Sequence, residues 1–163
     1  MQPDLFGVLP RKPAQSYRIP IYKIALVREA ALTVCQPPQL CSSAQAVSVI
    51  RTYLAETDRE HLLALTLDTR NRLIGINTVS VGSLNSSLGH PREIFKAAIL
   101  QNAAAIILAH NHPSGDPTPS SEDRALTERI KQAAELLGIR LLDHIVVGDG
   151  TERFFSFLDE GLL

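Results

Sequence analysis

Apolar residues in this 163-residue chain form short segments that alternate between the spacing of strands and the spacing of helices. Apolar runs of strand length indicate buried strands, and apolar positions three and four residues apart indicate amphipathic helices. The predicted strands are Tyr17–Arg28, Glu60–Leu67, Leu73–Val81, Ala104–His110, Arg140–Val147 and Phe154–Phe157. The predicted helices are Ala44–Ala55 after the serine pair 42–43, Arg92–Asn102 after Pro91, and Ser121–Leu137 before Gly138.

This alternation predicts an α/β domain in which helices flank a sheet. An early hairpin followed by a strand–helix–strand unit predicts that the sheet is mixed. A chain of 163 residues is long enough for one domain. Residues 1–16 have the composition of a loose arm, and Pro20 in the first predicted strand suits the edge of a sheet. We therefore expect an N-terminal arm and edge strand over residues 1–40 and the main domain over residues 41–163.

Composition limits the function classes that remain open. The chain is 45% hydrophobic and 20% charged, and its formal net charge is −1. It has no cluster of basic residues longer than Arg11-Lys12, so no strong nucleic-acid binding is expected. No secretory signal and no apolar run of membrane-spanning length are visible. Cys35 and Cys41 have no CxxC spacing and no histidine close by in the sequence, which indicates plain thiols, and together these features predict a cytoplasmic protein without a membrane partner.

The most informative segment is HNHPSGDPTPSSED, residues 110–123. Side chains two apart on a strand point the same way, so His110 and His112 would face one point at the end of a strand. With the carboxylate of Asp123 they could hold zinc and leave a fourth position open, as catalytic zinc sites do. A second interpretation remains open, because Ser120 and Asp123 also have the spacing of a capping box at a helix start.

The same residues resemble a known family. The order His-x-His-Pro, then Ser after six residues and Asp after two more, is similar to the signature of the JAMM (MPN+) metalloproteases. The wording of the loop resembles the bacterial RadC-like branch, and so do the flanking segments LDTRNRLIG (67–75), PREIFKAAI (91–99) and LLDHIVVG (141–148). Full-length RadC proteins carry a helix-hairpin-helix-like region ahead of this domain, and residues 1–40 do not resemble it. The expectation is therefore a short, stand-alone member of the family.

The resemblance implies a curved mixed sheet between helices, in a layout similar to that of cytidine deaminases. It implies a Zn²⁺ ion bound by His110, His112 and Asp123, and Ser120 as a donor to the oxyanion. Hydrolysis also needs a general base, for which the sequence offers Glu60, Glu93, Asp68 and Asp116. The family's glutamate lies well upstream at the start of a strand. Glu60 matches that place, and Glu93 is the reserve candidate.

The sequence also suggests roles for three other polar residues, Asn111, Asp143 and His144. Asn111 should point away from the metal and support the loop, because it lies between the two histidines on a strand. A carboxylate such as Asp143 could orient a ligand imidazole, but a structural role is favoured for both Asp143 and His144.

The leading functional hypothesis is a zinc-dependent metallohydrolase that cuts a peptide or isopeptide bond in a peptide or protein substrate. The alternatives are a non-catalytic interaction module with the same fold, and a DNA-repair-associated factor. Motifs of other hydrolases and of phosphate-binding proteins are absent, including HExxH, GxSxG and GxxxxGK[ST]. No feature of the sequence selects a substrate or an oligomeric state.

Overall fold

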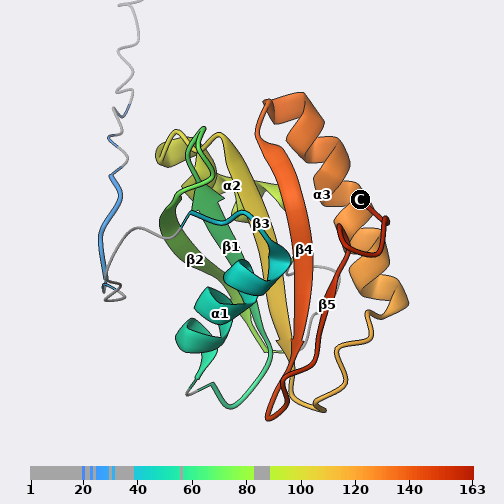
Figure 1. Cartoon of the computed structure of the whole chain (residues 1–163). Helices are drawn as coiled ribbons and strands as arrows, with labels where there is room; N and C mark the ends of the chain where they lie inside the picture. The colour runs from blue at the N-terminus through green and yellow to red at the C-terminus, as the bar shows by residue number, and fades with distance from the viewer. Residues whose placement is uncertain are drawn as a thin grey trace, which may run out of the picture.

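The computed structural model describes residues 39–55, 57–82 and 89–163, together with residues 20, 23, 25–29 and 31. Its helices are α1 (Ser43–Leu54), α2 (Pro91–Leu100) and α3 (Ser121–Leu137). Its strands are β1 (His61–Leu67), β2 (Leu73–Val81), β3 (Ala105–His112), β4 (Arg140–Gly148) and β5 (Phe154–Ser156). Figure 1 shows these elements arranged as one sheet with helices on both sides.

The sheet is open and mixed, with the strand order β2-β1-β3-β4-β5 within the described ranges. β3 and β4 are parallel because α3 connects them, whereas the other neighbouring strands are antiparallel. The α/β class and the mixed sheet predicted from the sequence are therefore confirmed.

Alternate residues of the central strands build two separate cores. Leu63 and Leu65 of β1 pack with α1 on one face of the sheet, in a core that also contains Ile107 of β3. Leu62 and Ala64 face the other side and pack with residues of α2 and α3. Strands that are buried on both faces explain why their sequences read as continuous apolar runs. The even-numbered residues of β1 and β3 consequently face α2 and α3.

Several predicted boundaries shift by one or two residues. β3 continues through His112, because its parallel pairing with β4 extends to Gly148. α2 ends at Leu100, and Asn102 has a left-handed φ of 53°, which is incompatible with continuing the helix. β1 begins at His61, so Glu60 lies just before the strand.

The predicted arm over residues 1–16 lies outside the described residues, as do Cys35 and residues 83–88. Most of the predicted strand Tyr17–Arg28 also lies outside them, and its few described residues belong to no strand. Cys41 is an exposed free thiol. In the described part of the chain, no helix combines the length and the apolar character needed to cross a bilayer.

Candidate metal centre

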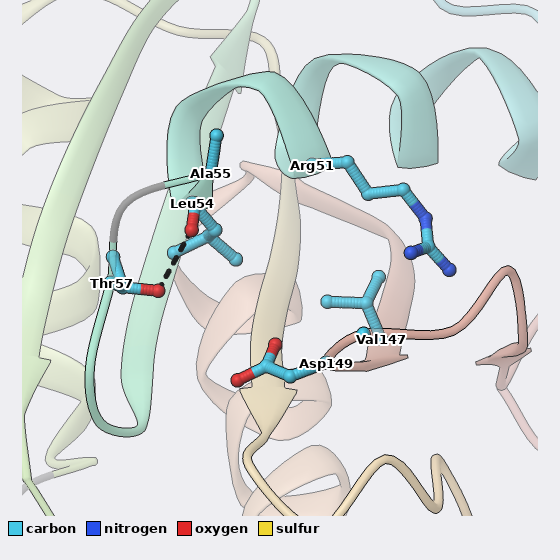
Figure 2. Close-up of a pocket in the computed structure, with 7 residues that line it drawn as sticks. Arg51, Leu54, Ala55, Thr57, Val147 and Asp149 are labelled. Atoms are coloured by element: carbon cyan, nitrogen blue, oxygen red, sulfur yellow. Dashed lines mark hydrogen bonds between the residues drawn. The ribbon is translucent and has the colours of Figure 1, made fainter.

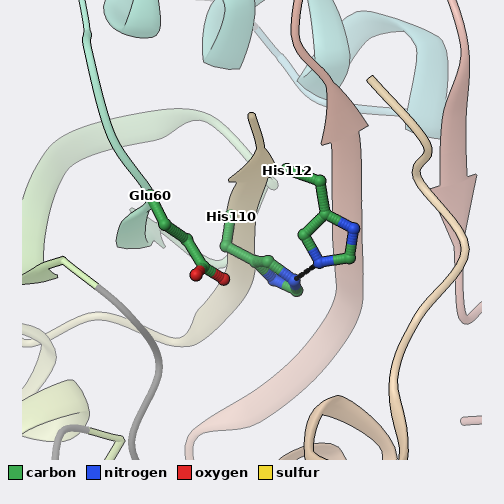
Figure 3. A group of neighbouring side chains, drawn as sticks. All are labelled: Glu60, His110 and His112. Carbon is green, nitrogen blue, oxygen red and sulfur yellow. Dashed lines mark hydrogen bonds between the residues drawn. The ribbon is translucent and has the colours of Figure 1, made fainter. Parts of the chain in front are cut away.

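Two histidines meet a glutamate where β3 ends beside the start of β1. His110 and His112 are two residues apart on β3 and share one face, as predicted. His110 pairs with Leu62 in the antiparallel register of β1 and β3, which brings Glu60 alongside the histidines. One possible ligand atom from each of Glu60, His110 and His112 lies within 4.8 Å of the others, and Figure 3 shows the three side chains.

The carboxylate of Asp123 reaches the same two histidines from the first turn of α3. His110 Nε2 lies 3.1 Å from His112 Nε2. Asp123 Oδ1 lies 3.3 Å from His110 Nε2, and Oδ2 lies 3.6 Å from His112 Nε2. A tetrahedral zinc ion with bonds near 2 Å would separate its ligand atoms by about 3.3 Å. The spacing of the three side chains therefore fits the zinc ion that the sequence predicts.

Asp123 also forms the capping box of α3, and its two carboxylate oxygens make different contacts. Ser120 is the N-cap, and its hydroxyl accepts a hydrogen bond from the Asp123 N–H at 3.1 Å. Oδ2 of Asp123 accepts hydrogen bonds from the Ser120 N–H at 2.8 Å and from the Ser120 hydroxyl at 2.7 Å. Oδ1 faces His110. The capping interpretation is thus confirmed without excluding the ligand interpretation, and Ser121 does not take the cap.

The charge state of the centre follows from these contacts. Burial alone would raise the pKa of Asp123, but hydrogen bonds with His110, His112 and Ser120 outweigh it and hold that pKa well below its usual range. The hydrogen bond to Asp123 raises the pKa of His112. His112 Nδ1 lies 2.7 Å from the backbone oxygen of Asp116, which can only accept, so this nitrogen carries the proton. The hydrogen bond to Asp123 then needs the second proton of a charged His112 on Nε2, and loss of that proton leaves a lone pair on Nε2 for a metal.

Asn111 holds the backbone on both sides of Glu60. Its side-chain oxygen accepts from the His61 N–H at 2.8 Å, and its amide nitrogen donates to the Arg59 carbonyl at 3.1 Å. The same nitrogen donates to Asp149 at 2.7 Å, and Asn111 is fully buried. Asn111 therefore supports the segment that carries Glu60, in addition to pointing away from the histidines.

The other carboxylates considered as bases have partners elsewhere. Glu93 pairs with Lys96 along α2, and Asp68 pairs with Arg72 in the hairpin turn. Asp116 accepts hydrogen bonds from Thr118 and pairs with Arg153. None of these three belongs to the group of Glu60 and the two histidines.

Asp143 and His144 have different surroundings, although a structural role was predicted for both. Asp143 accepts from the Ser156 hydroxyl at 2.6 Å and from the Leu158 N–H at 3.0 Å, so it anchors the C-terminal turn. His144 is fully buried, and its Nε2 lies 3.0 Å from His110 Nδ1. The sequence places His144 on a predicted strand. It does not show which residue of the adjacent strand lies beside His144.

A pocket of about 230 Å³ lies on the opposite, α1 side of the sheet. Figure 2 shows Arg51, Leu54 and Thr57 near the end of α1, facing Val147 and Asp149 at the end of β4. None of the predicted site residues lines this pocket, but the side-chain amide of Asn111 donates to its Asp149. The predicted ligands and base lie instead on the face covered by α2 and α3.

Comparison with known proteins identifies the family of this chain. The family described as the RadC-like JAB domain matches residues 40–162. A UPF0758 protein of Desulforamulus reducens is 46% identical over 139 residues, which cover 85% of this chain and 58% of that protein. A UPF0758 protein of Moorella thermoacetica is 58% identical over 106 residues, covering 65% of this chain and 45% of that protein. A third UPF0758 protein, from Methanococcoides burtonii, is 41% identical over 158 residues, covering 96% and 66%.

This chain thus spans about half to two thirds of the length of the curated relatives it matches. The matched range contains every element of the sheet, both histidines and Asp123. The resemblance that the segment HNHPSGDPTPSSED indicated is confirmed, and the chain belongs to the RadC-like JAB domain family.

Proposed function

We propose that this chain is a zinc-dependent hydrolase of peptide or isopeptide bonds. His110, His112 and Asp123 would hold the metal, and Glu60 would act as the general base. The observation that carries the proposal is the convergence of two imidazole nitrogens, 3.1 Å apart, on the carboxylate of Asp123, whose Oδ1 lies 3.3 Å from His110 and whose Oδ2 lies 3.6 Å from His112. When both imidazoles are neutral, their lone pairs and the negative charge repel one another at this spacing, so a cation bound between them is favourable.

Two neutral histidines and one carboxylate would leave the centre with a net charge of about +1 around a divalent ion. When bound, zinc supplies Lewis acidity, which polarises a substrate carbonyl and makes water a nucleophile near neutral pH. Three protein ligands leave one coordination position for water or substrate, which is the arrangement of catalytic zinc sites.

Glu60 would move the protons of the reaction. A hydrolytic water must lose a proton as it attacks, and the leaving amine must gain one. Glu60 is partly exposed and lies beside both histidines, so its carboxylate can accept the first proton and return it to the amine. Asn111 and the Gly82 N–H, which donates to the Glu60 carbonyl at 2.8 Å, hold the backbone that carries this carboxylate. Glu60 is therefore placed by backbone contacts that leave its side chain free to react.

Ser120 is proposed to stabilise the oxyanion of the tetrahedral intermediate by hydrogen bonding. Its hydroxyl donates to Asp123 Oδ2 here, so it would have to turn its proton from Asp123 to the substrate. The Ser120 N–H would continue to hold Asp123 Oδ2 during that change.

Metal content tests the centre directly. The purified chain, reconstituted with zinc and passed through a desalting column, is expected to retain about one zinc ion per molecule by elemental analysis. The double variant His110→Ala, His112→Ala should retain none, and Cys41→Ser, which changes an exposed thiol away from the centre, should bind zinc like the parent. A parent that retains no transition metal after reconstitution would contradict the proposal.

A DNA-binding function should be weak in this chain. The net charge of −1 supplies little neutralisation of phosphates, which dominates nonspecific affinity. We expect no binding to duplex DNA tighter than about micromolar near physiological salt, measured by fluorescence anisotropy. Submicromolar binding with a steep dependence on salt concentration would favour the DNA-associated alternative.

A further inference from the structure

We propose that Thr127 and His144 form a hydrogen-bond chain that fixes the tautomer of His110 and so keeps its Nε2 free of a proton. The inference rests on the proposed metal centre, since it names what orients one of the ligands. Thr127 and His144 would be positioning residues, because they act on the metal only through His110.

The hydrogen-bond chain links four groups on the α2 and α3 side of the sheet: the Asp123 carbonyl, the Thr127 hydroxyl and the rings of His144 and His110. The Thr127 hydroxyl lies 2.7 Å from the backbone oxygen of Asp123 and 2.6 Å from His144 Nδ1. The other ring nitrogen of His144, Nε2, lies 3.0 Å from His110 Nδ1. Each ring nitrogen along this path therefore has one hydrogen-bonding partner, and the path ends at the imidazole that faces Asp123.

The backbone carbonyl of Asp123, at one end of the hydrogen-bond chain, fixes the direction of every hydrogen bond in it. A backbone oxygen can only accept, so Thr127 donates its single hydroxyl proton to Asp123. The Thr127 oxygen must then accept from His144, which places the His144 proton on Nδ1. A neutral His144 has a lone pair on Nε2, and it accepts the Nδ1 proton of His110. His110 is left with a lone pair on Nε2, which is the atom 3.3 Å from Asp123 Oδ1.

The surroundings keep these rings in place and away from water. His110 and His144 are both 0% exposed, and Thr127 is 3% exposed, so water does not compete for the hydrogen bonds. The ring of His144 stacks on Phe157 with a centroid distance of 4.9 Å and an interplanar angle of 10°. The polar contacts of the His144 ring are a hydroxyl and an imidazole, and no carboxylate is hydrogen-bonded to it.

Removing the Thr127 hydroxyl should reverse the direction of the hydrogen bond between His144 and His110. In Thr127→Val, His144 Nδ1 has no acceptor, so the tautomer protonated on Nε2 becomes favourable. That tautomer donates to His110 Nδ1 and forces the His110 proton onto Nε2, between Asp123 and His112. Zinc would then have to displace a proton from its own ligand. Thr127→Ser keeps the hydroxyl and should preserve the parent's arrangement.

The test reads the tautomers in the metal-free protein by long-range ¹H–¹⁵N correlation spectra of labelled histidines. In the parent and in Thr127→Ser, both His110 and His144 should be protonated on Nδ1 alone. In Thr127→Val, both should gain signals of the Nε2-protonated form. A parent in which His110 carries its proton on Nε2 would overturn the inference, whatever the zinc affinity.

Zinc affinity, measured by competition with a chromophoric chelator, is the second readout. Thr127→Val should bind zinc about 10- to 100-fold more weakly than the parent, the usual effect of losing a partner that orients a ligand. Thr127→Ser should bind like the parent, and so should Thr66→Val, which removes another fully buried hydroxyl that contacts Gly75 and Gln101 away from the centre. An unchanged affinity and unchanged tautomers in Thr127→Val would refute the inference. If the parent binds no zinc but shows the expected tautomers, the metal centre fails and the hydrogen-bond chain stands.

Discussion

Replacing Glu60 with glutamine is expected to slow hydrolysis by about 100- to 10,000-fold, which is the usual contribution of a general base. Glutamine has nearly the same shape but cannot take a proton from water. Glu60 lies beside both histidines, and its backbone is held by Asn111 and Gly82, so the substitution should leave the fold intact. Cleavage would be followed with a library of quenched fluorescent peptides and isopeptides, with the zinc content of each sample measured in parallel.

The matched control is Glu93→Gln, which changes a glutamate paired with Lys96 on α2. We expect this variant to cleave like the parent. In Glu60→Gln the zinc content should remain that of the parent, because the proposal places Glu60 beside the ligands and not among them. Loss of zinc in Glu60→Gln would make Glu60 a ligand, and loss of cleavage in Glu93→Gln alone would move the base to α2.

Replacing Asp123 with asparagine should weaken zinc binding at least about tenfold, equivalent to about 1.4 kcal/mol. The carbonyl oxygen of asparagine can take the place of Oδ2 and accept from the Ser120 N–H and hydroxyl, as Asp123 does. Its amide group would then face His110 in the place of Oδ1, where it offers no lone pair to a metal. The stability that zinc adds to the parent should shrink in proportion to the lost affinity.

The metal-free forms of Asp123→Asn and the parent should unfold with free energies that differ by only a few tenths of a kcal/mol, from the loss of charge at the helix N-terminus. Denaturant unfolding with a chelator present, at a pH where the histidines are neutral, measures this difference. Ser120→Ala gives the opposite pattern, with about 1 kcal/mol lost in the metal-free form and a smaller loss of zinc affinity. If Asp123→Asn destabilises the metal-free form by more than about 1 kcal/mol and binds zinc normally, Asp123 is a capping residue alone.

Local patterns in the sequence predicted most of the fold correctly. The segment Ser121–Leu137 is the helix predicted from its apolar spacing, with Ser120 before it and Gly138 in the left-handed conformation after it. The hairpin of β1 and β2 was also predicted, because strand spacing and turn residues are short-range signals. Strand ends were predicted less well, because the end of β3 depends on how far β4 pairs with it.

The sequence by itself determined the pairs of site residues that are close along the chain. His110 and His112 share a face because strand side chains alternate, and Ser120 and Asp123 meet because they are three residues apart at a helix start. The choice of Glu60 came from the family resemblance, since four carboxylates were possible on composition alone.

Only the tertiary structure decided which distant residues join these pairs. Glu60 lies beside His112 through the register of β1 and β3, and His144 lies beside His110 through the pairing of β3 and β4. The division of Asp123 between a capping oxygen and an oxygen facing His110 also depends on how α3 packs on the sheet. Register and packing arise from burying apolar side chains of many elements at once, and no local segment of the sequence contains that information.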